Sequence, residues 1–268
     1  MDLDEARAVV AERYHAMLAI LPPERHSQMS PVVAARPGVL LQIELTSAGP
    51  IGKAEATMWK STVAASERHE LCDLMDQVGP DAHTLCEGWR TRDLAAHLVL
   101  REGRPDAVGG ILLPPLARYT AGVQSNIAQR SWPELVDLLR NGPPWWSPLN
   151  LPGLGDKINT MEFFVHHEDV RRAATGWKPR PADPRRAEVL WEVLRWGAQV
   201  LYRKSPVGVV LRTLDGSEHA ARRGARSVTV VGSPEELTLH AFGRDEAIVE
   251  IEGDQADVAS LRGSQRGL

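Results

Sequence analysis

Apolar side chains recur at helical spacing over most of residues 60–203. The first such stretch runs from Lys60 to Val78 and stops at Gly79-Pro80, because proline and glycine disfavour helix continuation. Its inward residues are expected to be Val63, Leu71, Leu74, Met75 and Val78. The same pattern predicts further helices from Thr91, over Leu116–Arg130, from Ser131, over Lys157–Ala174 and from Asp183 to Arg203.

Several ends of these helices carry capping residues. Thr91 is expected to cap its helix through the side chain, with Asp93 in the first turn, where a carboxylate interacts favourably with the helix dipole. Ser131 and Glu134 fit a capping box, and Gly176 suits the position just after the helix that precedes it. Four main helices with polar side chains on inward faces predict a bundle.

The period of the pattern changes after about residue 205. β-rich stretches cover 207–213, 228–231 and 247–252, a hairpin-type turn covers 214–217, and two helices are expected from Ser233 and over Gln255–Leu261. The expected class is therefore α+β, with an N-terminal four-helix bundle over 58–178 and a smaller α+β domain over 179–268.

Residues 1–57 do not join this pattern. Asp4–Leu21 can form a helix that Pro22-Pro23 ends, and one short apolar run, Val39–Leu45, follows among helix breakers. A regular amphipathic pattern begins only after Met58. Either translation starts at Met58, or the segment is a genuine helical arm or flexible leader, and the sequence leaves both interpretations open.

Composition excludes several classes of protein. No run approaches the roughly 18 apolar residues that a membrane span needs, and a net charge of -4 argues against a dedicated nucleic-acid binder. The first residues are acidic where a signal peptide would be basic. Two cysteines, Cys72 and Cys86, cannot form a disulfide framework, so a cytoplasmic location is expected.

An ionisable stripe runs along the apolar face of the helix predicted over Lys157–Ala174. At about 100° per residue, Asn159, Glu162, His166 and Asp169 fall within roughly 80° of one another. A buried, unpaired carboxylate is unfavourable, so this stripe requires a compensating cation. The opposite face is expected to be the solvated one; it carries Glu168, Arg171 and Arg172.

His97 is expected to point into the same bundle from the helix that starts at Thr91. Together with Glu162 and His166 it supplies two imidazoles and a carboxylate, a donor set that suits Zn²⁺, with iron, manganese and nickel as alternatives. Three protein donors leave positions for water or substrate. Asp169 is expected to be a fourth ligand or an acceptor that orients a ligating imidazole. The alternative is a satisfied core histidine beside a buried hydrogen-bonded pair.

Other candidates are weaker. The sequence has no Gly-x-Ser-x-Gly elbow and no P-loop, and neither cysteine lies close to a patterned histidine. His167 is rotated away from His166, so it is not expected to be a ligand. The stretch 178–226 holds 11 Lys and Arg against 5 Asp and Glu; its densest part, Arg222–Arg226, either binds an anionic substrate or thiol cofactor, or is a solvated basic face. Packing is expected for Trp89, a pocket wall or packing for Trp145 and Trp146, and surface or structural roles for His15, His26, His69, His83, His219 and His240.

Four segments resemble the N-terminal metal-binding domain of the mycothiol-dependent maleylpyruvate isomerase family, within the DinB-like metalloprotein superfamily. They are Leu71–Leu74, Thr84–Trp89, Arg92–Leu98 and Asn159–Arg172. The resemblance covers about 60–265 and implies a DinB-like four-helix bundle in which His97, Glu162 and His166 hold a divalent metal, usually zinc. It also implies a low-molecular-weight thiol as nucleophile.

The His-His-Glu-Asp segment looks most like an uncharacterised branch of that family, so the resemblance does not supply a substrate. The leading hypothesis is a metal-dependent enzyme, a mycothiol-dependent isomerase or transferase that acts on a small anionic electrophile. A non-catalytic metal-binding or sensor module and a metal-dependent hydrolase stay open as alternatives.

Overall fold

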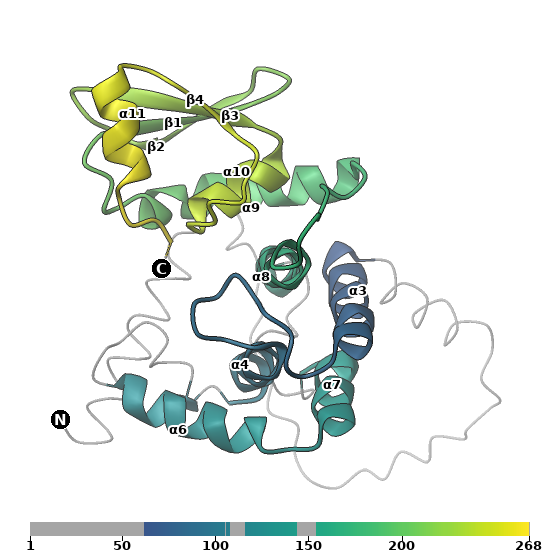
Figure 1. Cartoon of the computed structure of the whole chain (residues 1–268). Helices are drawn as coiled ribbons and strands as arrows, with labels where there is room; N and C mark the ends of the chain where they lie inside the picture. Colours follow the sequence, from purple (N-terminus) through teal and green to yellow (C-terminus); the bar gives the residue numbers. More distant parts are fainter. Residues whose placement is uncertain (1–61, 105, 108–115, 144–153, 268) are drawn as a thin grey trace, which may run out of the picture. The chain divides into compact units, whose positions relative to one another are not determined.

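The computed structural model describes residues 62–104, 106–107, 116–143 and 154–267 (Figure 1). The predictions made for residues 1–57, for His15 and His26, and for Trp145 and Trp146 lie outside these residues. Thr62–Leu268 form one compact unit, and the division into domains at residue 178 stays a prediction.

The first part of this unit is helical. It contains α3 (Val63–Val78), α4 (Thr91–Gly103), α6 (Ala117–Ala128), α7 (Trp132–Asn141) and α8 (Leu154–Arg172). An apolar core joins four of these helices; its fully buried members include Leu71 of α3, Leu98 of α4, Leu135 of α7 and Phe163 of α8. Val78 was expected to point inward but is 41% exposed, because it is the last residue of α3 before the turn at Gly79.

Two of the predicted helix caps are wrong in detail. Thr91 is the first residue of α4 rather than its cap, and its hydroxyl donates to the Gly79 carbonyl at 2.5 Å. The Asp93 carboxylate instead accepts from the Arg90 N–H at 2.9 Å. Ser131 does precede α7, but its side chain accepts no capping hydrogen bond, and Glu134 pairs with Arg130 instead of closing a capping box.

The second part of the unit is mixed. It contains α9 (Pro184–Leu201), β1 (Gly208–Thr213), β2 (Glu218–Arg222), β3 (Ser227–Gly232), α10 (Pro234–Ala241), β4 (Glu250–Glu252) and α11 (Gln255–Arg262). The strand order is β2-β1-β3-β4, with β1 parallel to β3 and the other pairs antiparallel. The α+β class is confirmed. β2 was not predicted, because its sequence is polar, as suits a strand at the edge of a sheet.

Helix α8 lies between the two parts (Figure 1). Phe163 and Val170 belong to the core shared with α3, α4 and α7, whereas Met161, Phe164 and Val165 belong to the core formed with α9, the sheet and α10. The helix is therefore covered on both sides. It begins earlier than predicted and ends at Arg172, before the left-handed Gly176 (φ +76°).

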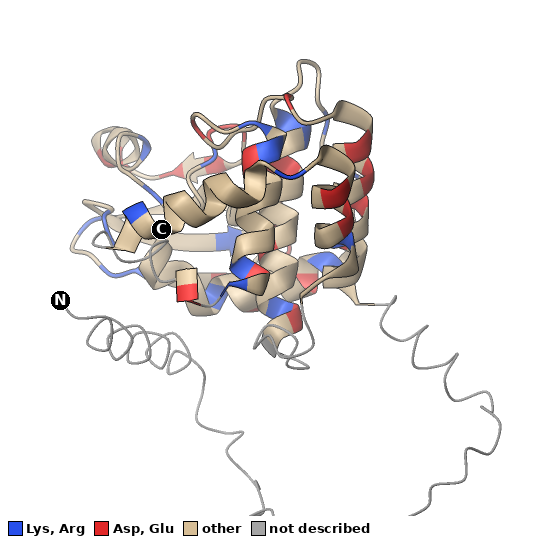
Figure 2. Cartoon of the chain, turned by 90° about the horizontal axis from the view of Figure 1, so that it is seen from below, with Lys and Arg blue, Asp and Glu red and all other residues tan. Residues whose placement is uncertain are grey.

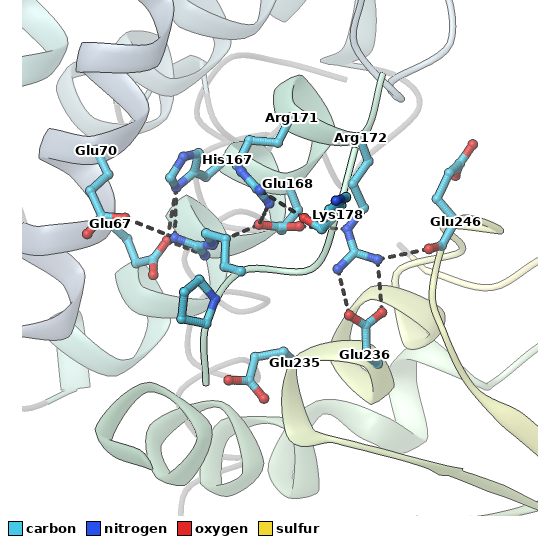
Figure 3. A network of polar contacts seen from close by, with 12 residues as sticks. Glu67, Glu70, His167, Glu168, Arg171, Arg172, Lys178, Glu235, Glu236 and Glu246 are labelled. Carbon is cyan, nitrogen blue, oxygen red and sulfur yellow. Dashed lines mark hydrogen bonds and ion pairs between the residues drawn. The ribbon is translucent and has the colours of Figure 1, made fainter. Parts of the chain in front are cut away.

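The face of α8 that was expected to be solvated is buried. Glu168 is 1% exposed and Arg172 is 4% exposed, because α9 and α10 cover this side of the helix. Burial of charge requires pairing. The Glu168 carboxylate accepts from Arg171 at 2.8 Å and from Arg172 at 2.6 Å (Figure 3). It also lies 2.8 Å from Arg180 Nε.

The network extends to both neighbouring parts of the chain. Arg172 donates twice to the Glu236 carboxylate of α10, at 2.6 and 2.9 Å (Figure 3). Arg180 donates to Glu67 of α3 at 2.9 Å. Together with the contacts of Glu168 to Arg172 and Arg180, these ion pairs connect α3, α8 and α10. We call Glu67, Glu168, Arg172, Arg180 and Glu236 the buried ion network.

Charges of both signs lie on the same described helices (Figure 2). None of the helices that the structure describes combines the length and the apolar character needed to cross a membrane.

Glu168→Gln tests the buried ion network. The neutral amide leaves Arg172 and Arg180 with less compensating charge in a buried setting, so the free energy of unfolding should fall by about 3 kcal/mol at pH 7. The pKa of Glu168 is lowered: burial opposes this, but Arg172 and Arg180 outweigh it. A lowered pKa stabilises the fold above the ordinary value of 4.5, so the difference from wild type should shrink as the pH falls below 4.5.

Urea unfolding at pH 7 and pH 4 measures both effects. Glu134→Gln in α7 is the matched control, because its pair with Arg130 is about half exposed and should contribute little. Equal losses in the two variants would contradict a role for the network in stability.

Candidate metal centre

Three predicted donors meet between α4 and α8. Glu162 Oε1 lies 3.5 Å from His97 Nε2 and 3.3 Å from His166 Nε2, and one donor atom from each residue lies within 4.8 Å of the others. A tetrahedral zinc ion with bonds of about 2.1 Å places its donors about 3.4 Å apart. The spacing of this triad therefore fits a shared ion.

The triad is buried but not sealed. His97 and His166 are each 8% exposed, whereas the Glu162 side chain is 20% exposed. The i,i+4 spacing of Glu162 and His166 on α8 places both on one face, and His97 faces them from α4. Trp89 lies against the His97 ring, with ring centroids 5.1 Å apart, consistent with the packing role expected of it.

Asp169 fixes the orientation of the His166 ring. His166 Nδ1 donates to Asp169 Oδ2 at 2.9 Å, which directs Nε2 toward Glu162. Asp169 is fully buried, which favours its neutral form, but Arg244 and His166 outweigh this and hold the pKa of Asp169 below its usual range. A carboxylate that orients a metal-ligating imidazole makes the same kind of contact. That Asp169 has this role stays a prediction.

The protonation of the triad follows from its neighbours. Burial, His166 and Arg101 together lower the pKa of His97, although Glu162 raises it. Asp169, Cys86 and Glu162 outweigh burial and raise the pKa of His166 well above its usual value, so a metal ion that binds this ring displaces a proton from it. Burial favours protonated Glu162, but Arg101, His166 and His97 hold its pKa well below the ordinary value. Arg101 Nε lies 3.5 Å from Glu162 Oε1, and Arg101 Nη1 donates to the Asn159 side chain at 2.8 Å.

Two further residues of this site were not found from the sequence. Arg244, which follows α10, donates to both oxygens of Asp169 at 2.7 Å. Cys86 Sγ donates to Asp169 Oδ2 at 3.2 Å, lies 4.0 Å from His166 Nδ1 and accepts from Arg244 at 3.4 Å. The expectation that neither cysteine lies near a patterned histidine is therefore wrong. The Leu85 N–H donates to the Asp169 carbonyl at 3.0 Å and holds this loop against α8.

The cluster Arg222–Arg226, which the distribution of charge along the sequence indicated as a possible anion site, does not make these contacts. Arg222 donates to the Arg203 carbonyl at 2.5 Å, and Arg226 pairs with Asp257 at 3.1 Å. No sequence pattern distinguishes Arg244 from other arginines, because its partner Asp169 is 75 residues away.

Two other groups in the described part of the chain bring possible metal donors together. In Cys86, His166 and Asp169, the carboxylate already binds the Arg244 guanidinium at two positions. In Glu67, Glu70 and His167, the Arg180 guanidinium lies within 3.1 Å of all three side chains. A cation already compensates each group, whereas the closest guanidinium contact of Glu162 is the 3.5 Å one with Arg101.

No protein-family model matches the sequence, and no curated protein matches it. Two solved structures are similar to the chain: crystal structures of the mycothiol-dependent maleylpyruvate isomerase and of one of its point mutants. Each covers 72% of this chain and 91% of its own, at 14% identity, with TM-scores of 0.48 for the isomerase and 0.49 for the mutant. The similar structures thus come from the family that the sequence resembles.

Proposed function

We propose that the chain binds one divalent metal ion, zinc in the first instance, through His97, Glu162 and His166. The observation that carries this proposal is the spacing of the three donor atoms, at 3.3 and 3.5 Å about the Glu162 oxygen. The orientation of His166 by Asp169 supports it. We further propose that α3, α4, α7 and α8 are the DinB-like four-helix bundle that carries the ion.

A three-donor site leaves coordination positions for a ligand from solution, and the partial exposure of Glu162 suits that access. A divalent ion in such a site lowers the pKa of a bound thiol or water and so supplies a nucleophile at neutral pH. The residues of the chain hold the donors in place: Asp169 keeps His166 turned, and Arg244 keeps Asp169 ionised.

The proposed activity is a thiol-dependent isomerisation or transfer that acts on a small electrophile, with mycothiol as the thiol and the cytoplasm as the compartment. The resemblance of the segments around His97, Glu162 and His166 to the mycothiol-dependent family supports the choice of thiol. Metal-dependent hydrolysis and non-catalytic metal binding are the alternatives.

Metal content tests the donor set. The purified wild-type protein should retain about one divalent ion per chain, and His97→Ala and His166→Ala should retain little, because two remaining donors bind weakly. His69→Ala is the control, since His69 is an exposed histidine of α3 outside the triad. Elemental analysis and circular dichroism of all four proteins measure metal and fold. Equal metal in all four would exclude the site.

Asp169→Asn tests the orienting contact. The amide has nearly the size of the carboxylate but lacks its negative charge, so its hydrogen bond with His166 Nδ1 is weaker. Metal affinity should therefore fall about 10- to 100-fold. Competition with a chelator measures the affinity. Asp156→Asn, in the first turn of the same helix, is the control. The double variant Asp169→Asn with Arg244→Gln also removes the guanidinium that Asp169→Asn would leave without its carboxylate partner. Unchanged affinity in both Asp169 variants would refute the orienting role.

Activity over a panel of small electrophiles separates the proposed reaction from its alternatives. Conversion should require both mycothiol and metal, and it should be lost in His166→Ala. Conversion without any thiol would favour hydrolysis, and no conversion by a fully metal-loaded protein would favour a binding module.

A further inference from the structure

Helix α10 ends in a turn that sets the direction of Arg244. The Gly243 N–H donates to the His240 carbonyl at 3.0 Å, and Gly243 has a left-handed φ of +81°. The Arg244 N–H donates to the Leu239 carbonyl, also at 3.0 Å. These two hydrogen bonds form a Schellman motif, which fixes the path of the chain as it leaves the helix. Arg244 Nη1 also donates to the Phe242 carbonyl at 2.7 Å, so this side chain is held by the turn from which it extends.

The segment Ser264–Gly267, which follows α11, packs against this turn, and we call it the strap. Its Arg266 side chain is 5% exposed, and the guanidinium contacts the turn on both sides. Arg266 Nε donates to the His240 carbonyl at 3.1 Å, and Nη2 donates to the Asp245 carboxylate at 2.8 Å. A Cβ on Gly243 would lie 3.0 Å from the Arg266 carbonyl, so the backbones of the strap and the turn are also in close contact.

The strap is itself anchored to two helices. The Gly267 N–H donates to the Leu201 carbonyl of α9 at 3.1 Å, and Arg203 Nη1 donates to the Gly267 carbonyl at 2.9 Å. Arg266 Nη1 donates to the Leu261 carbonyl of α11 at 3.2 Å. Leu201 and Leu261 both belong to the core around the sheet. The strap therefore holds the turn after α10 against that core.

We propose that Arg266 is a positioning residue of the metal centre. This inference rests on the proposed metal site and adds a distant residue that supports it. Arg244 donates to both oxygens of Asp169 at 2.7 Å, and Asp169 in turn accepts from His166 Nδ1 at 2.9 Å. A group that orients a metal ligand is effective only when it is itself held in place. Loss of the Arg266 contacts lets the turn open, so Arg244 binds Asp169 for less of the time and His166 is less firmly oriented.

Arg266→Gln, alone and together with Arg244→Gln, tests this path as a double-mutant cycle. Competition with a chelator should show that Arg266→Gln lowers the affinity for Zn²⁺ about 3- to 10-fold, a part of the effect that loss of an orienting contact has. With Arg244→Gln already present, the same change should alter the affinity less than about twofold, because the path is already broken. Arg212→Gln is the matched control: Arg212, on β1, pairs with Glu218 and Glu252, and its loss should not change metal affinity.

Hydrogen exchange supplies a measurement that needs no metal. In the metal-free protein, Arg266→Gln should speed the exchange of the Gly243 and Arg244 amides about tenfold or more, because the turn opens more often. The Leu135 N–H of α7, which donates to the Ser131 carbonyl at 3.0 Å, should exchange as in the wild type. Zn²⁺ should in turn slow the exchange of the Arg244 amide in the wild type, because coupling between two sites is reciprocal.

Gly267→Ala loosens the same contact without changing Arg266. Gly267 has a left-handed φ of +92°, and a Cβ there would lie 3.1 Å from the Phe242 carbonyl, so alanine is strained at this position. This variant should also lower the affinity for Zn²⁺. It takes the place of Arg266→Gln in the cycle if that variant does not fold.

The outcomes separate this inference from the proposed function. If the wild type bound no Zn²⁺, the proposed metal site would be wrong and the inference with it. If the wild type bound Zn²⁺ and Arg266→Gln bound it equally well, only the positioning role would be wrong. A loss of the same size with and without Arg244→Gln would also overturn that role. Equally faster exchange at Leu135 and Arg244 would overturn it too, because it would indicate a loss of overall stability.

Discussion

The structure depends on the burial of a charged helix. α8 is packed on both sides yet carries Glu162, Glu168 and Asp169, and a buried carboxylate is tolerated only beside a cation or several donors. Each of these three side chains faces a guanidinium from another part of the chain: Arg101 from α4, Arg180 from the segment before α9, and Arg244 from the segment after α10. Pairing along α8 thus determines which distant segments meet there.

The three carboxylates of α8 differ in the number and closeness of their guanidinium partners. Three arginines surround Glu168, and Arg244 binds both oxygens of Asp169, which also accepts from His166. Glu162 lies 3.3 and 3.5 Å from two imidazole nitrogens, and its guanidinium contact, at 3.5 Å, is longer than those of Glu168 and Asp169. This difference along one helix distinguishes the two carboxylates that guanidinium groups bind closely from Glu162.

Much of this arrangement follows from local sequence. The helices, the α+β class and the side-by-side placement of His97, Glu162 and His166 follow from the spacing of apolar and ionisable residues. The burial of Glu168 and Arg172 does not follow from local sequence. Charges on one face of a helix indicate a solvent-exposed face, and only the tertiary structure shows that α9 and α10 cover it. The contacts of Cys86 and Arg244 with Asp169 join residues 83 and 75 positions apart, and no local pattern encodes them. The N-cap of α4 is Arg90, one residue before the predicted Thr91, whose hydroxyl donates to the backbone carbonyl of Gly79 instead.

The position of α8 also bears on how the chain gains its structure. Its side chains complete two apolar cores at once, so neither core can close before this helix is in place. A fragment cut after residue 178 would expose Met161, Phe164 and Val165 to water and leave Arg172 without its partner on α10. The helical and the mixed segments therefore share the side chains of α8, and their unfolding should be coupled.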